Sequence, residues 1–223
     1  MARMTKEELR EDPILERVQQ TLNFVQSNAR WIALGVAAVI ILIAGVIMIN
    51  RSRVRAETDA AQLLSAGQQL YLQGNYAESE SQLQQLLDMH GASRAAAQAW
   101  IYLADGLAAQ ERREEALAAY ESAGGRGTTP IIRAAAARGR GTVLEDLEQF
   151  GEASKAYEEA AGVETIFQVD DLLGAARTAL QAADPARAQV LLEQAQAIKA
   201  TGRSVNRAKI QFYLSQAEAA LSK

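Results

Sequence analysis

The segment WIYLADGLAAQERREEALAAYESA, residues 100–123, contains two amphipathic patterns separated by a polar stretch. Residues spaced three and four apart lie along one stripe of a helix, which can then pack on a neighbour. The residues that recur at this spacing are Trp100, Leu103, Leu107, Ala116, Tyr120 and Ala123. The small side chain of Ala104, in the middle of the first stripe, lets a second helix approach closely. The segment therefore predicts a helical hairpin.

Similar patterns occur before and after this segment, at a nearly constant period. Small residues in the first helix of each pattern fall at Gly67, Ala104, Gly141 and Ala176. Small residues in the second helix fall at Ser79, Ala116, Ala153 and Ala188, with steps of 37, 37 and 35 residues. A single hairpin cannot bury its own apolar face, so such units must stack on one another. The period predicts a solenoid of about four hairpins.

This pattern resembles the tetratricopeptide repeat (TPR), in which W-x2-L-G/A-x2-Y is followed by A-x3-F/Y-x2-A. Residues 100–123 match it best, whereas Ala179 and Leu192 replace the expected aromatic residues in the fourth unit. The apolar spacing between Val205 and Leu221 predicts one closing helix. We expect an all-α chain in which a single N-terminal transmembrane helix precedes an α-solenoid of TPR-like hairpins.

The transmembrane helix is predicted from the stretch Trp31 to Ile49, which holds nineteen residues without a charge. At about 1.5 Å of rise per residue it spans about 28 Å, close to the hydrocarbon core of a bilayer. A buried core helix rarely stays uncharged on all sides for five turns. A cleaved signal peptide has an apolar region of only about 7–15 residues. We therefore expect an uncleaved anchor that contacts the lipid bilayer through residues 31–49.

Four parts follow along the chain, namely residues 1–30, 31–49, 50–60 and 61–223. Residues 1–30 form an N-terminal tail, in which Asp12-Pro13 could start an amphipathic helix on the membrane or on a partner, or a short helix leading into the span. Residues 50–60 contain no proline, glycine or other turn signal. We expect them to form a helical connector that runs directly into the repeat domain, a kink near Asn50 being the alternative.

The order of tail, span and TPR-like repeats resembles a bacterial family, the ancillary subunit of the Sec translocon that works beside a periplasmic chaperone. The resemblance implies a single-pass inner-membrane protein with a cytoplasmic N-terminus and a periplasmic repeat domain. The charges near the span leave the orientation open, because Arg17 and Arg30 precede it while Arg51, Arg53 and Arg55 follow it. Counting the whole N-terminal tail reverses that balance.

The composition excludes several classes of partner and site. Residues 56–223 carry 15 Lys and Arg against 22 Asp and Glu, a net charge of −7. Backbone phosphates require clustered basic residues, so we expect no nucleic-acid partner. The chain has no cysteine, which excludes disulfides and thiolate metal sites.

No cluster of residues in the sequence indicates catalysis. His90 is the only histidine and is expected at a helix C-terminus. The carboxylates of Asp170-Asp171 and of residues 145–148 lack metal-ligand spacing with histidine. The glycines of residues 124–127 lack the Lys-Ser/Thr of a phosphate loop and predict a loop between repeats. We expect no enzyme activity, cofactor, metal or small-molecule substrate.

The expected function is that of a non-catalytic scaffold that binds membrane or periplasmic proteins, the resemblance implying an accessory of the Sec translocon. In TPR-like stacks the first helices line a groove, which here lacks the basic ring that would clamp a carboxylate terminus and so suits an extended peptide or a protein face. The family offsets place in it Gln68, Tyr71, Ile101, Asp105, Arg138, Thr142, Glu145, Asp170, Leu173 and Arg177. Alternatively, the chain is an accessory subunit of another large inner-membrane complex. It would then use the small residues of the span as its contact, namely Gly35, Ala37, Ala38, Ala44 and Gly45.

Overall fold

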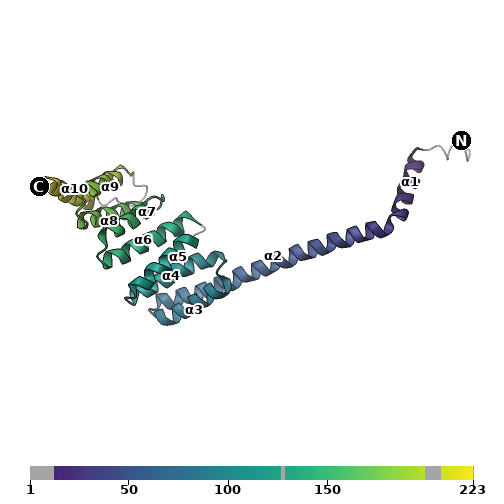
Figure 1. Cartoon of the computed structure of the whole chain (residues 1–223), viewed down its shortest axis with the longest axis horizontal. Coiled ribbons are helices and arrows are strands. Elements are labelled where there is room, and N and C mark those ends of the chain that lie inside the picture. Colours follow the sequence, from purple (N-terminus) through teal and green to yellow (C-terminus); the bar gives the residue numbers. More distant parts are fainter. Residues whose placement is uncertain (1–12, 127–128, 199–206, 223) are drawn as a thin grey trace, which may run out of the picture. The chain divides into compact units, whose positions relative to one another are not determined.

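The computed structural model describes residues 13–126, 129–198 and 207–222, which form ten helices and no strand (Figure 1). The chain divides into two units, Met1–Arg55 and Ala56–Lys223. The predicted start of a helix at Asp12 and the beginning of the segment from Val205 lie outside the described residues.

The first unit contains helix α1, Pro13–Ser27, and the N-terminal part of helix α2, Ala29–Leu72. The side chains of the apolar stretch of α2 are exposed, Ile41 by 72% and Leu42 by 68%. This stretch is long and apolar enough to cross a membrane, and none of it is buried inside the chain. It is therefore not the core helix of a globular unit. Helix α2 continues without interruption through residues 50–60.

The second unit is a row of helical hairpins closed by one further helix (Figure 1). The C-terminal part of α2 pairs with α3, and the remaining pairs are α4 with α5, α6 with α7, and α8 with α9, after which α10 packs on α9 and α8. The bounds are α3 Tyr76–His90, α4 Arg94–Ala109, α5 Arg113–Arg126, α6 Pro130–Asp146, α7 Phe150–Ala161, α8 Gln168–Gln181, α9 Pro185–Ala197 and α10 Arg207–Leu221. The predicted fold class is confirmed.

Every hairpin turns in the same way at the end of its first helix. One residue of each turn has a left-handed backbone, namely Gly74 (φ 79°), Glu111 (62°), Glu148 (59°) and Ala183 (59°). The next N–H bonds back to the carbonyl five residues earlier, as from Asn75 to Leu70 at 3.0 Å. This bond caps the helix end as in a Schellman motif. The steps between these four turn residues are again 37, 37 and 35.

Small residues at the predicted positions allow the helices of each hairpin to pack closely. A Cβ atom added to Gly67 would lie 2.7 Å from Cδ2 of Leu83, which is completely buried. The hydroxyl of Ser79 donates a hydrogen bond of 2.8 Å to the carbonyl oxygen of Gly67. The corresponding second-helix residues Ala116, Ala153 and Ala188 have no exposed surface. The periodic small residues therefore mark the core contacts of the repeats.

The prediction of a loop at residues 124–127 is wrong for residues 124–126, which are helical. Gly124 and Gly125 lie in the last turn of α5, which extends to Arg126. Glycine lowers helix propensity by only about 1 kcal/mol relative to alanine, which the packing of buried Tyr120 and Ala123 outweighs. Residues 127 and 128 lie outside the described part of the chain.

Candidate protein-binding surface

The ten residues predicted to line a groove all lie on first helices, that is, on α2, α4, α6 and α8. We call the surface that these helices share the first-helix face. Leu173 does not belong to its accessible part, because only 3% of it is exposed. The reason is that α8 packs against α7, α9 and α10 and is covered on several sides. Asp170, three residues earlier, is exposed.

Three tyrosine rings lie together in the first two repeats, Tyr71 and Tyr102 on the first-helix face and Tyr76 at the start of α3 beside it. The ring of Tyr71 lies 5.6 Å from the rings of both Tyr76 and Tyr102, with the Tyr102 contact edge-to-face. Gly106 on α4 lies next to these rings, since a Cβ there would be in van der Waals contact, at 3.9 Å, with both Tyr71 and Tyr76. Burial, with a smaller effect of the Asp105 charge, raises the pKa of Tyr71. The sequence predicted Tyr71 here but not Tyr76 or Tyr102, which lie outside the groove offsets.

Asp105 lies beside this tyrosine cluster and is partly buried. Its carboxylate accepts a hydrogen bond from the hydroxyl of Tyr120 on α5. Burial raises the pKa of Asp105, and the bond from Tyr120 opposes that effect. Burial, followed by the charge of Asp105, raises the pKa of Tyr120 as well. Asp105 therefore serves first to join α4 to α5, with little of its charge presented to solvent.

Arg138 on α6 forms a two-bond ion pair with Asp171 on α8. The distances are 2.5 Å from Nε to Oδ1 and 2.7 Å from Nη2 to Oδ2. The Asp171 side chain is 1% exposed, and the Arg138 guanidinium also stacks 4.6 Å from the ring centre of Phe167. Asp171 lies in the first turn of α8, and its carboxylate is occupied by the neighbouring repeat.

A second ion pair joins the same two helices near their C-terminal ends. Arg177 on α8 donates to Oε2 of Glu145 on α6 at 2.6 Å. The hydroxyl of Tyr157 on α7 also donates to Glu145, at 3.3 Å, and lies 3.0 Å from the Thr142 hydroxyl. The structure therefore brings Arg138, Glu145 and Arg177 together, but as contacts between repeats.

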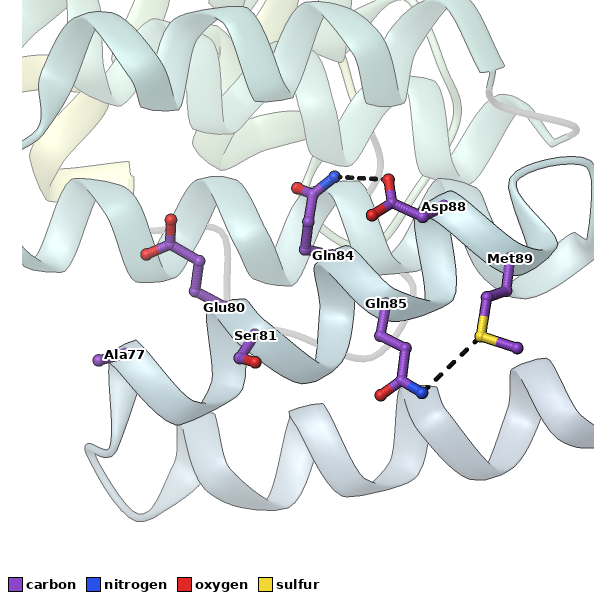
Figure 2. Close-up of a pocket in the computed structure, with 7 residues that line it drawn as sticks. All are labelled: Ala77, Glu80, Ser81, Gln84, Gln85, Asp88 and Met89. Atoms are coloured by element: carbon purple, nitrogen blue, oxygen red, sulfur yellow. Dashed lines mark hydrogen bonds between the residues drawn. The ribbon is translucent and has the colours of Figure 1, made fainter.

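The structure also contains an open pocket that the sequence did not predict, on the outer face of α3 (Figure 2). Its lining residues all come from this one helix, at positions spaced three and four apart. Gln84 donates to Asp88 at 3.0 Å, and Gln85 donates to the sulfur of Met89 at 3.7 Å. Glu80, at the other end, pairs with Arg112 at 2.7 Å. The polar groups of the pocket are thus largely bonded to one another or to the next repeat. The pocket contains none of the predicted groove residues.

The titratable groups of the described residues do not assemble into a metal site. No group of three or more His, Asp or Glu side chains among them is placed to hold a metal ion. His90 occupies the last turn of α3, where it can interact with the helix dipole.

Comparisons with known proteins agree on the architecture. No protein-family model matches the chain, and no characterised protein matches its sequence. Among solved structures, the kinesin light chain TPR-like repeats of Podospora anserina match with a TM-score of 0.57 and 15% identity, over 74% of this chain and 88% of that one. PilF of Pseudomonas aeruginosa matches with a TM-score of 0.56 and 17% identity, over 77% and 71%. At these identities the likeness shows a shared TPR-like fold.

Proposed function

We propose that this protein is a non-catalytic scaffold tethered to the bacterial inner membrane through residues 31–49, with a cytoplasmic N-terminus and a periplasmic repeat domain. In this role it binds envelope proteins as an accessory of the Sec translocon and its periplasmic chaperones. The observation that carries the proposal is helix α2, in which an exposed apolar stretch of membrane-spanning length and the first helix of a TPR-like stack form one element.

The binding surface of this scaffold is the N-terminal half of the first-helix face. Arg138, Glu145 and Arg177 are committed to ion pairs between repeats. Tyr71 and Tyr102, by contrast, are held in place by their neighbours while remaining partly exposed. Rigid tyrosines are frequent anchors of protein interfaces because they bury a large area at a small entropic cost. They suit an extended peptide or the face of a folded partner.

The orientation is tested by adding protease to spheroplasts that express the full chain with a C-terminal epitope. A periplasmic repeat domain loses the epitope without lysis of the cells. Protection of the epitope until the membrane is disrupted would reverse the proposed topology.

The partner is tested by purifying the full chain in mild detergent and quantifying the Sec translocon subunits that accompany it. We expect the double variant Tyr71→Ala/Tyr102→Ala to lose them. The matched control is Phe212→Ala, which removes an exposed aromatic ring from α10, outside this surface. Equal recovery from the double variant and from Phe212→Ala would exclude the tyrosine cluster as the contact.

A second candidate function places the main contact in the span, within another inner-membrane complex. It is favoured by Gly35 and Gly45, since a Cβ added at either would meet no atom within 4 Å, which leaves small surfaces open for a partner helix. Replacing residues 31–49 with an unrelated apolar span of equal length separates the two. Partners that survive the exchange bind the repeats, and partners that are lost bind the span.

A further inference from the structure

The first helices of the second unit run parallel, so their starting points lie along one edge. Arg138, at the middle of α6, and Asp171, in the first turn of α8, connect these two helices. Glu145 and Arg177 connect the later parts of the same two helices. Between α2 and α4, the Glu57 carboxylate accepts a hydrogen bond of 3.1 Å from the backbone N–H of Arg94, at the start of α4. We call the edge that carries these helix starts and the connections leading into them the start edge.

The start edge presents large apolar side chains to solvent in or next to three successive connections. Met89, in the last turn of α3, is 63% exposed, and Ile131, in the first turn of α6, is 67% exposed. Between α7 and α8, Ile166 is 72% exposed and Phe167 is 41% exposed. A single exposed apolar residue is ordinary on a protein surface, but a row of them along one edge is typical of an interaction surface.

The opposite edge, where each hairpin turns, has a different composition. Its turns consist mostly of polar or small residues, Gln73-Gly74-Asn75, Gln110-Glu111-Arg112, Leu147-Glu148-Gln149 and Ala182-Ala183-Asp184. Leu72, which is 73% exposed, is the large and strongly exposed apolar side chain found there among the described residues. The contrast between the edges shows that the apolar row is not a general property of the loops of this repeat domain.

Two features of the start edge favour a lipid surface as its occupant. The chain enters the second unit at Ala56, one residue before Glu57, so the apolar stretch of α2 is covalently joined to the unit at this edge. Arg94 and Arg133 lie in the first turns of α4 and α6, are exposed, and form no ion pair among the described residues. Apolar side chains with arginines nearby suit the headgroup region of a bilayer, although this edge also carries the exposed carboxylates Asp88 and Glu164.

We infer that the start edge docks onto the bilayer surface, with Met89, Ile131 and Ile166 inserted among the headgroups and with Arg94 and Arg133 near lipid phosphates. This inference rests on the proposed membrane tether. It adds a second contact with the lipid, made by the repeats themselves, which leaves the polar edge and the first-helix face available to protein partners.

The natural chain has no cysteine, so single cysteines can report the depth of chosen positions. Full-length Ile131→Cys, Ile166→Cys, Leu72→Cys and Ile41→Cys are each labelled with an environment-sensitive nitrobenzoxadiazole dye. They are reconstituted in nanodiscs of phosphatidylcholine and phosphatidylglycerol. Quenching is compared between lipids with a nitroxide near the top of the acyl chain and lipids with a nitroxide near its end. Leu72 is the matched control, since it is equally exposed but lies at the opposite edge.

We expect the labels at positions 131 and 166 to lose emission with the shallow nitroxide, the label at 41 to lose emission with the deep one, and the label at 72 to keep its emission. Exchanging Arg94 and Arg133 for glutamine should reduce the quenching at 131. A quenched label at 41 with unquenched labels at 131 and 166 overturns the docked edge while preserving the tether, as does equal quenching at 72. An unquenched label at 41 overturns the tether itself.

Discussion

The carboxylate of Asp171 accepts hydrogen bonds from two N–H groups of Arg138. Only 1% of the aspartate side chain is exposed, against 27% of the arginine side chain. The two residues are 33 positions apart and belong to adjacent repeats. A solenoid is stabilised largely by the interfaces between neighbouring repeats. This pair is therefore part of the interface that joins the third hairpin to the fourth.

Replacing Arg138 with methionine should lower the free energy of unfolding by about 3 kcal/mol, because it leaves a buried carboxylate without its partner. The double variant Arg138→Met/Asp171→Leu should recover most of that loss. Urea unfolding of the full chain in detergent, followed by far-ultraviolet circular dichroism, measures both. The control is Arg112→Met, which breaks more exposed ion pairs with Glu80 and Glu115. It should cost less than about 1 kcal/mol. An equal loss in the two single variants would contradict the assignment.

Gly139→Ala should destabilise the contact between α5 and α6. The new Cβ would lie 2.2 Å from Cε1 of Tyr120, a buried ring that is also held by its bond to Asp105. Overpacking of this kind costs about 1–3 kcal/mol. Gly151→Ala, in α7, meets no atom within 4 Å and should be neutral or stabilising by up to about 1 kcal/mol. The difference between the two urea midpoints is the measurement, and similar midpoints would show that Tyr120 moves aside freely.

Ala183→Gly should stabilise the chain by about 1 kcal/mol, because Ala183 has a left-handed backbone with φ 59°. Gly74→Ala, at the equivalent turn with φ 79°, should have the opposite effect of similar size. Ala182→Gly provides the control, since φ is −77° there and glycine brings no relief of strain. Thermal unfolding of the three variants checks the order, and a gain from Ala182→Gly as large as that from Ala183→Gly would argue against backbone strain as the cause.

Asp105 should make stability depend on pH. Burial raises the pKa of its carboxyl in the folded chain, so its contribution is fully present below the ordinary value of about 3.9 and is lost as the pH rises through the raised pKa. The wild type should therefore gain stability relative to Asp105→Asn as the pH falls from 7 to 4. Urea midpoints of both proteins across this range give the difference. Parallel profiles would show that the bond from Tyr120 cancels the effect of burial.

The repeat period could be predicted because packing imposes it on the sequence. A helix hairpin needs a small residue at each point of close approach, so Ser79, Ala116, Ala153 and Ala188 revealed the period and are buried as expected. The helix ends were harder to predict, because Glu111 and Glu148 occupy turn positions that usually carry glycine. Gly124 and Gly125 led to the opposite error, because they predicted a loop but lie inside α5.

The predicted surface was less accurate than the fold, since pairing between repeats depends on atoms far apart in sequence. Counting offsets located Arg138, Glu145 and Arg177 on the correct helices but could not show that their charges are used in ion pairs. Leu173 was misplaced because the count assumed that every first helix shows the same side to solvent, whereas α10 also covers α8. The apolar start edge depends on three connections whose common location becomes visible only when the helices are stacked.

The two ion pairs between α6 and α8 have opposite polarity, which bears on how the repeats avoid stacking wrongly. Along α6 the order is arginine then glutamate, and along α8 it is aspartate then arginine. If α8 slid along α6 until Arg177 reached Arg138, two positive charges would meet and the buried Asp171 would lose its partner. Similar hairpins with alanine-rich faces could otherwise pack in several alignments, a known hazard of repeat proteins. The order of charges thus favours the native alignment over the one in which the two arginines would meet.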